Sequence, residues 1–530
     1  MLIEFKTRAL AGVALGALMA LPAPGALADT ASEIRALKAR LGKLEVQAIK
    51  EKEEAKAHAA SQTASAGHSS GSGASNSSPP APKHWYERIS LRGYTQMRYN
   101  DILQAGPYYN DVATPGDRSV GPRQNFLIRR ARLIFSGDIS DHLSIYIQPD
   151  MASAPGGAFS STPTLAATSL YGQQANAFGT YNTNTGYFVQ LRDAYADIYF
   201  DKDKEFRVRA GQSKIPYGFE NMQSSQNRLA LDRAEAINSC CKDERDLGLF
   251  FYYTPKHMRT LFRDLVKNNL KGSGDYGMFA FGVYNGQGAN RIELNKNTHL
   301  VSRFTYPHVF ENGQIVEASV QGYTGRFVPY VAAIDPSLYG GTFLAGYRPP
   351  GYPGNGIPFV NAPGYGNLGN YVLTTYPRAS AWGAAAVNGG QGLKDERVAV
   401  TGVLYPQPFG LRAEWNWGRG PVLDDTQTTI NSGRLHGGYV EATYKYEDQE
   451  FGTGTWFPFV KWQHFNGGQK FENNAPRNKV YELDVGLEYQ PLPELEFALI
   501  YSKMNRTNVL QAPYRQFHAD LMRAQLKWNY

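Results

Sequence analysis

The sequence predicts an all-β protein, a transmembrane antiparallel β-barrel of about 16 strands. Three observations lead to this prediction: a secretory N-terminal segment, about sixteen short stretches of alternating apolar and polar residues, and a C-terminal stretch that alternates and ends on tyrosine. Mean hydropathy is −0.43. Beyond the N-terminus no run of about 20 apolar residues occurs, which excludes a helical membrane protein.

Residues 1–28 have the pattern of a signal peptide. Lys6 and Arg8 form a basic start, and the apolar stretch ALAGVALGALMAL is too short to span a bilayer. Ala26-Leu27-Ala28 fits the small-x-small cleavage rule. We therefore expect export from the cytoplasm, with cleavage after about Ala28.

Two further segments precede the barrel. Residues 29–58 contain about two heptads with apolar a and d positions, which favours a short coiled-coil helix, although a solvated helix that frays fits as well. Residues 59–84 are rich in Ser, Gly and Pro and are typical of a flexible linker. Residues 1–84 hold three of the seven excess positive charges, so +4 remains for residues 85–530. Any preference for anions must therefore come from where the charges lie.

Residues 85–530 are expected to form the outer-membrane barrel. In the stretch 205–212, for example, apolar residues at even positions alternate with Arg207 and Arg209. The stretches predicted as strands are 89–100, 125–136, 143–149, 189–200, 205–212, 246–254, 278–285, 299–306, 315–323, 397–405, 411–417, 434–446, 455–465, 479–488, 495–501 and 518–530.

The connections between these stretches alternate in length. Those after odd-numbered strands are mostly long, and those after even-numbered strands are mostly short, as expected for extracellular loops and periplasmic turns. The connection 255–277 is longer and is predicted to hold a short helix. At the C-terminus, alternate residues of DLMRAQLKWNY form one apolar face that ends at Tyr530, which is common in outer-membrane barrels.

The segment FLIRRARLIF, residues 126–135, places three arginines in an apolar strand. Alternation puts Leu127, Leu133 and Phe135 on one face together with Arg129. An arginine facing lipid costs about 2–4 kcal/mol at the bilayer midplane. We therefore expect Arg130 and Arg132 in the lumen, and Arg129 at a rim, a subunit contact or a bulge. The same alternation assigns four more arginines to the lumen: Arg92, Arg98, Arg207 and Arg209.

Acidic residues share the predicted lumen. Asp193 and Asp197 face inward by the same alternation and are expected to pair with some of the arginines. A column of unpaired guanidinium groups would attract anions, whereas a column paired with carboxylates would form an electrically balanced wall. Both interpretations remain open from the sequence.

Five segments resemble the phosphate-selective porin O and P family: FLIRRARLIFSG (126–137), LRDAYADIYF (191–200), FRVRAGQSKIPYGFENMQSSQNRLALDR (206–233), DLGLFFYY (246–253) and FGVYNGQGAN (281–290). The resemblance implies a homotrimeric, sixteen-stranded outer-membrane channel for anions. It also implies that the third long loop, about 213–245, folds into the lumen as a constriction loop.

The resemblance suggests roles for individual residues. The paired arginines of the family's anion site match Arg129 and Arg130, and its constriction-loop serines match Ser224 and Ser225. The loop also carries Lys214 and Arg228. Two positions depart from the family pattern, because Tyr94 and Asn221 stand where phosphate-specific members carry an arginine and a lysine. Fewer cations at a constriction would weaken phosphate binding.

The expected function is passive diffusion of small anions, phosphate or other oxyanions, through an arginine-lined lumen. The alternative is a general or sugar-type porin for small neutral and mixed solutes, with tyrosines as stacking surfaces. The expected partners are small anionic solutes and outer-membrane lipid, without nucleic acid, metal or cofactor. An enzyme is not expected, since neither G-x-S-x-G nor H-E-x-x-H occurs. Cys240 and Cys241 are adjacent and form either two loop thiols or one vicinal bridge.

Overall fold

The computed structural model describes residues 84–105, 125–153, 187–241, 245–329, 392–423, 430–448, 454–472, 475–508 and 515–530. The segments predicted as signal peptide and coiled-coil helix, and the linker apart from His84, lie outside the described residues. The described residues belong to one compact unit, Lys83–Tyr530. Among them no helix is long and apolar enough to cross a membrane.

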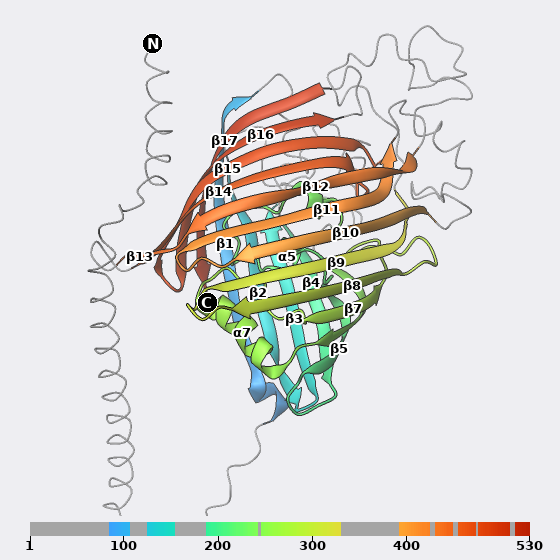
Figure 1. Cartoon of the computed structure of the whole chain (residues 1–530), viewed down its shortest axis with the longest axis vertical. Helices are drawn as coiled ribbons and strands as arrows, with labels where there is room; N and C mark the ends of the chain where they lie inside the picture. The colour runs from blue at the N-terminus through green and yellow to red at the C-terminus, as the bar shows by residue number, and fades with distance from the viewer. Residues whose placement is uncertain are drawn as a thin grey trace, which may run out of the picture. The chain divides into compact units, whose positions relative to one another are not determined.

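The unit is a closed antiparallel β-barrel (Figure 1). Its strands are β1 (Ile89–Ala105), β2 (Asn125–Ser140), β3 (Leu143–Ser153), β4 (Tyr187–Tyr199), β5 (Phe206–Lys214), β6 (Arg245–Tyr253), β7 (Phe279–Tyr284), β8 (His299–Val309), β9 (Ile315–Phe327), β10 (Leu393–Leu404), β11 (Phe409–Leu423), β12 (Ile430–Tyr444), β13 (Tyr446–Asp448), β14 (Gly454–Gly468), β15 (Arg477–Leu492), β16 (Leu495–Asn508) and β17 (Arg515–Asn529). The short helices are η1 (Trp85–Arg88), α5 (Phe219–Met222), α6 (Glu235–Asn238) and α7 (Lys256–Lys267).

Apart from β12, each strand pairs with the next one along the chain, and β17 pairs with β1. Only Lys445 separates β12 from β13, and both pair with β14, so together they form one strand of the wall. The wall therefore has sixteen strands, and the predicted barrel is confirmed. At the seam, the Gly93 amide donates to the Tyr530 carbonyl at 2.6 Å and the Tyr530 amide donates to the Gly93 carbonyl at 3.0 Å.

The side chains of the wall alternate between two environments. In β8, Val301 and Arg303 are buried inside the barrel, whereas the neighbouring residues Leu300 and Phe304 are exposed on the outside. A strand whose two faces meet lipid and a polar lumen requires this period of two. The same requirement explains why the strands could be located from the sequence.

The constriction loop, residues 215–241 of the β5–β6 connection, lies inside the barrel. The Tyr217 hydroxyl donates to Asn416 Oδ1 of β11 at 2.6 Å, and the Gln96 amide of β1 donates to the Ser225 carbonyl at 3.0 Å. The loop therefore reaches both sides of the lumen. Near its end Cys240 and Cys241 form a buried vicinal disulfide, which decides between the two predicted alternatives.

Helix α7 confirms the helix predicted in the β6–β7 connection. Phe262 and Leu265 are buried and pack in one cluster with Phe219 of the constriction loop and Tyr405 after β10. Lys256, Arg263 and other polar residues occupy the opposite, exposed face. The helix is amphipathic because its apolar side supports the loop inside the barrel.

Candidate functional site

A β-bulge in β2 turns three arginines toward the lumen. Gln96 of β1 pairs with Arg130, and the next β1 residue pairs with Ile128, which leaves Arg129 as the extra residue. Arg129, Arg130 and Arg132 are all buried inside the barrel. Arg129 was expected at a rim, a subunit contact or a bulge, and the structure places it at a bulge.

Because of the bulge, Leu127 lies on the inner face and not on the outer face predicted for it. Leu127 is buried inside the barrel, whereas Leu133 and Phe135, on the other side of the bulge, keep their outward orientation. One inserted residue reverses the alternation for every residue that precedes it. Simple alternation through the segment was therefore wrong at Leu127.

Arg132 is held by a carboxylate and two hydroxyl groups. Its Nε donates to Asp150 Oδ2 of β3 at 2.9 Å, and its Nη1 donates to the Tyr94 hydroxyl at 2.7 Å and to Ser225 Oγ at 3.2 Å. Tyr94 and Ser225 are themselves 2.6 Å apart. Tyr94, one of the two departures from the family pattern, thus joins the β1–β2 wall to the constriction loop.

Arg130 lies among like charges. Its Nη1 donates to Gln96 Oε1 at 2.8 Å, and no described carboxylate forms an ion pair with it. Arg129, Arg132 and Arg228 are its main electrostatic neighbours. These four residues, named here the arginine cluster, come from β2 and the constriction loop.

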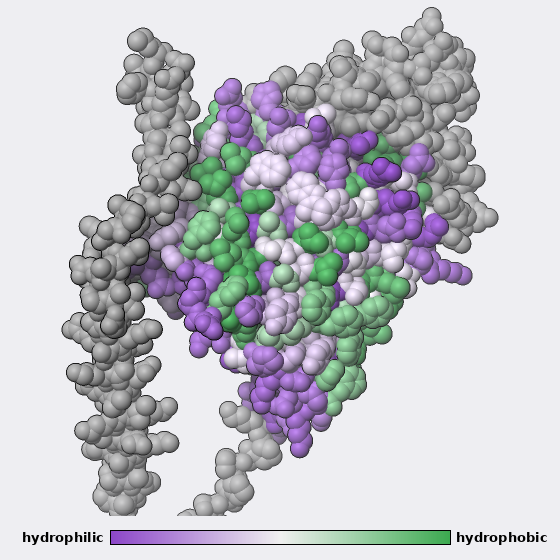
Figure 2. Space-filling model, in the orientation of Figure 1, coloured by the Kyte–Doolittle hydropathy of each residue, from purple (hydrophilic) through white to green (hydrophobic). Residues whose placement is uncertain are grey.

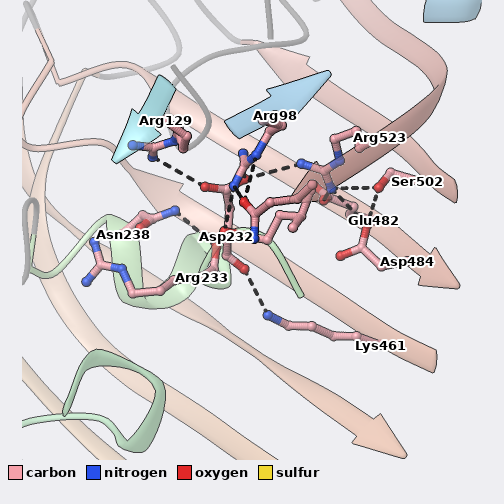
Figure 3. Close-up of polar contacts among 12 residues, drawn as sticks. Arg98, Arg129, Asp232, Arg233, Asn238, Lys461, Glu482, Asp484, Ser502 and Arg523 are labelled. Carbon is pink, nitrogen blue, oxygen red and sulfur yellow. Dashed lines mark hydrogen bonds and ion pairs between the residues drawn. The ribbon is translucent and has the colours of Figure 1, made fainter. Parts of the chain in front are cut away.

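Asp232 of the constriction loop forms ion pairs with three arginines of the barrel wall (Figure 3). Its carboxylate lies 3.0 Å from Arg98, 3.4 Å from Arg129 and 3.2 Å from Arg523. Arg523 also contacts Asp484 at 3.1 Å. The loop is therefore anchored by its own acidic group, and part of the positive charge of the wall is neutralised there.

The predicted lumen residues on β4 and β5 are also paired. Arg209 donates to both Asp197 oxygens, at 2.7 and 2.8 Å, and stacks 3.8 Å from the Tyr195 ring centre. Arg207 donates to Asp275 at 2.8 Å. These bidentate and buried contacts favour a structural role for this part of the arginine column.

Asp193 forms an ion pair, whereas Arg92 does not form one with a described residue. Asp193 accepts from Arg245, with an Nη2–Oδ2 distance of 2.8 Å. Arg92 has the inward parity of β1, is exposed and makes no hydrogen bond or ion pair with a described residue. Arg92 is therefore a free lumen cation among the predicted residues.

The predicted loop residues Lys214 and Ser224 contact the loop itself. Lys214 Nζ donates to the carbonyls of Asn221, Met222 and Gln223 at 2.8–3.1 Å, and so caps α5. Ser224 Oγ accepts a backbone N–H two residues further on. Both residues hold the shape of the loop.

Sequence reasoning missed a second bulge and most of the carboxylate partners. Gln148 pairs with Asp193 and Pro149 pairs with Leu191, so Arg192 is an extra residue and is buried inside the barrel. Asp150 lies within 4.0 Å of its Nε. The sequence signal was the crowding of charges in LRDAYAD, but no pattern gives the position of a bulge within it.

Positive charge still exceeds negative charge inside the barrel. The buried side chains of the described residues include 20 Arg or Lys and 14 Asp or Glu. Counting Asp232 and Asp275, which are only slightly more exposed, leaves four more cations than carboxylates. The wall is thus largely balanced, with a positive remainder to which Arg130 belongs.

A family model described as phosphate-selective porin O and P matches residues 104–335 and 358–530. The chain belongs to this family. The barrel is accordingly that of a porin of the bacterial outer membrane, a channel rather than an enzyme. No curated protein matches the chain.

Solved structures with similar folds include outer-membrane channels from several bacteria. DcaP of Acinetobacter baumannii is 11% identical, with a TM-score of 0.43, and the match covers 83% of this porin and 97% of that chain. OprB of Pseudomonas putida is 9% identical, with a TM-score of 0.44, covering 84% and 94%. An anion-selective porin from Comamonas acidovorans is 8% identical, with a TM-score of 0.41, covering 83% and 99%.

Proposed function

We propose that this porin passes small anions, phosphate or other oxyanions, by passive diffusion through its lumen. The observation that carries the proposal is Arg130, a buried guanidinium beside three other arginines and without a carboxylate partner. A guanidinium keeps its charge and presents several N–H donors in one plane, which suits an oxyanion. Arg129, Arg132 and Arg228 add to the positive potential there.

The paired arginines contribute differently. The charges of Arg207 and Arg209 are largely offset by Asp275 and Asp197. An anion passing these groups meets a balanced surface that neither holds nor rejects it strongly. Conduction requires binding weak enough for release, and a short unpaired region in a balanced wall meets that requirement.

A general or sugar-type porin is the second candidate. It is favoured by the many carboxylates of the lumen and by the parallel stacking of Tyr146 on Tyr195, with ring centres 5.1 Å apart. Phosphate specificity in particular is weakened by Tyr94 and Asn221, which supply no cation. The proposal is therefore oxyanion preference, with phosphate as one of several permeant anions.

The test is the reversal potential of the porin in a planar bilayer under a potassium chloride gradient. We expect a sign that indicates anion preference, and an anion-to-cation permeability ratio reduced at least about twofold in Arg130→Gln. The control is the double variant Arg209→Gln with Asp197→Asn, which removes one cation and one anion together and should leave the ratio unchanged. Cation preference in the wild type would overturn the proposal.

Assembly and processing complete the proposal. The family implies a homotrimer, and native mass spectrometry of the detergent-solubilised porin should give three copies. N-terminal sequencing of the exported protein should begin at about Asp29. A monomer, or an unprocessed N-terminus, would contradict these two parts without affecting anion preference.

A further inference from the structure

The outward face of β9–β12 carries cations at the ends of the strands that lead into the long loops. Lys394 of β10, Arg419 of β11 and Arg434 of β12 are exposed there, and we name them the loop-end patch. Arg419 pairs directly with Arg434 across β11 and β12. Figure 2 shows hydrophilic residues gathered at the right-hand ends of these strands, beside a more hydrophobic middle.

The loop-end patch holds more positive charge than its neighbours neutralise. Glu396 contacts both Lys394, at 2.8 Å, and Arg419, at 3.5 Å. Arg434 forms no hydrogen bond or ion pair with a described residue. The patch therefore has three cations for one carboxylate, so that one shared negative charge offsets only part of the positive charge and Arg434 has no described partner.

An apolar groove of about 570 Å³ lies on the same outer face, next to the patch. Its walls are outward side chains of β7, β8, β10 and β11: Phe281, Leu300, Val398 and Trp417. Gly322 and Gly418 line it without side chains, which makes the hollow. Glu396, the carboxylate between Lys394 and Arg419, also lines the groove.

The other side of the barrel lacks this combination. At the loop ends of β2, β4 and β6, the outward residues are Phe126, Val189 and Leu247, exposed by 70%, 56% and 52%. The apolar surface there continues to the end of the strand, without an outward cation. Exposed lysines also occur toward the loop ends of β15 and β16, Lys479 and Lys503, but none occurs among the described residues at the loop ends of β2, β4 and β6. The loop-end patch is therefore not part of a continuous ring of cations around the rim.

We propose that the groove and the loop-end patch together bind one phosphorylated lipid of the outer leaflet, of the lipid A type. An acyl chain would lie in the groove between Phe281 and Trp417, and the headgroup phosphate would contact Lys394, Arg419 and Arg434. Cations near a membrane surface attract anionic headgroups, and a mainly apolar hollow of this size accommodates an acyl chain. The inference rests on the membrane location of the family and is independent of anion transport.

The test is native mass spectrometry of the full-length porin, delipidated in a nonionic detergent and titrated with diphosphorylated lipid A. The wild type should retain lipid A. The triple variant Lys394→Gln, Arg419→Gln, Arg434→Gln should bind at least about tenfold more weakly. Gly322→Val, which places a side chain in the groove and keeps every charge, should weaken binding as well, so the inference is testable even if the triple variant fails to fold.

Two controls separate this site from other anion sites. The triple variant Lys202→Gln, Arg263→Gln, Lys267→Gln removes three exposed cations from the short-turn end and should leave lipid binding unchanged. Inorganic phosphate in large excess should not displace lipid A, and the reversal potential of the loop-end variants should equal that of the wild type. Equal lipid binding by the wild type and the loop-end variants, an equal loss in the control triple, or displacement by phosphate would each overturn the inference.

Discussion

Asp232 links the position of the constriction loop to the charge of the lumen. Its carboxylate contacts arginines from β1, β2 and β17, and β17 meets β1 only through barrel closure. Removing a carboxylate from such a cluster has two effects. The arginines lose an attractive partner, and the lumen gains positive charge.

We therefore predict that Asp232→Asn raises anion preference and lowers stability. The anion-to-cation permeability ratio should rise at least about twofold, because Arg98, Arg129 and Arg523 lose a shared negative charge. The free energy of unfolding should fall by about 1–3 kcal/mol, since an amide can replace only part of the lost hydrogen bonding. Reversal potentials and urea unfolding of the same preparation measure both quantities, and an unchanged ratio would contradict the electrostatic assignment.

Asp275, in the β6–β7 connection, makes stability depend on pH. Burial alone raises the pKa of this carboxyl, but the Arg207 guanidinium and hydrogen bonds from Thr254 and the Gly277 amide outweigh it, and the pKa is about 2. Because the folded pKa lies below the unfolded value, this contribution is complete above about pH 4 and is lost as the pH falls toward 2. It amounts to about 2 kcal/mol.

The measurement for Asp275 is the urea midpoint between pH 6 and pH 2. The wild type should lose this contribution over the lower half of that range, and Asp275→Asn should start lower at pH 6 and show a smaller decline. Parallel pH profiles for the two proteins would show that Asp275 does not contribute in this way.

The arginines show how far residue-level prediction reaches. Alternation correctly indicated that Arg130 and Arg132 point into the barrel. The prediction was reliable because the opposite orientation would place a charged side chain in lipid. It failed at Leu127 and did not find Arg192, because each bulge shifts the alternation by one residue. Asp150 is the cross-strand neighbour of Arg132 in the β2–β3 hairpin, and sequence reasoning overlooked it. Asp232 and Asp275 are distant in sequence from their arginines, and their approach depends on connections whose shape no local pattern determines.

At the scale of elements, helix α7 packs against the constriction loop. Phe262 and Leu265 of α7 share a cluster with Phe219 of the loop, and the Gln223 amide donates to the Lys271 carbonyl at 2.7 Å. The sequence predicted the helix because the connection 255–277 is longer than the other short turns. Its packing partner could not be predicted, because the apolar face of a helix does not specify which surface covers it.

We predict that Phe262→Ala loosens the constriction loop. The loss of a buried aromatic ring should cost about 3–5 kcal/mol of stability. Without this support the loop should fluctuate, and single-channel recordings should show larger current noise at an unchanged sign of selectivity. Arg263→Ala, on the exposed face of the same helix, is the matched control and should behave as the wild type. Equal noise in both variants would mean that the helix does not support the loop.

At the scale of the whole molecule, closure of the barrel depends on the seam between β1 and β17. The sixteen strands were predictable because each must satisfy lipid on one side and polar groups on the other. The seam itself joins residues about 435 positions apart, Thr95 and Tyr530, whose hydroxyl groups are 3.4 Å apart. A side chain at Gly93 would meet the Tyr530 ring and the Arg132 carbonyl, so the close approach requires glycine there.

We predict that Gly93→Val impairs closure of the barrel. Valine suits a strand, so a defect would not come from strand propensity but from the collision with Tyr530 and the β2 backbone. A closed barrel resists sodium dodecyl sulfate until it is heated, and the fraction of compact, heat-modifiable porin on a gel should fall by at least about half, as expected for a strain of a few kcal/mol. Leu91→Val, two residues away on the exposed outer face, is the control and should fold normally. If Gly93→Val gives as much compact porin as Leu91→Val, the contact with Tyr530 is not needed for closure.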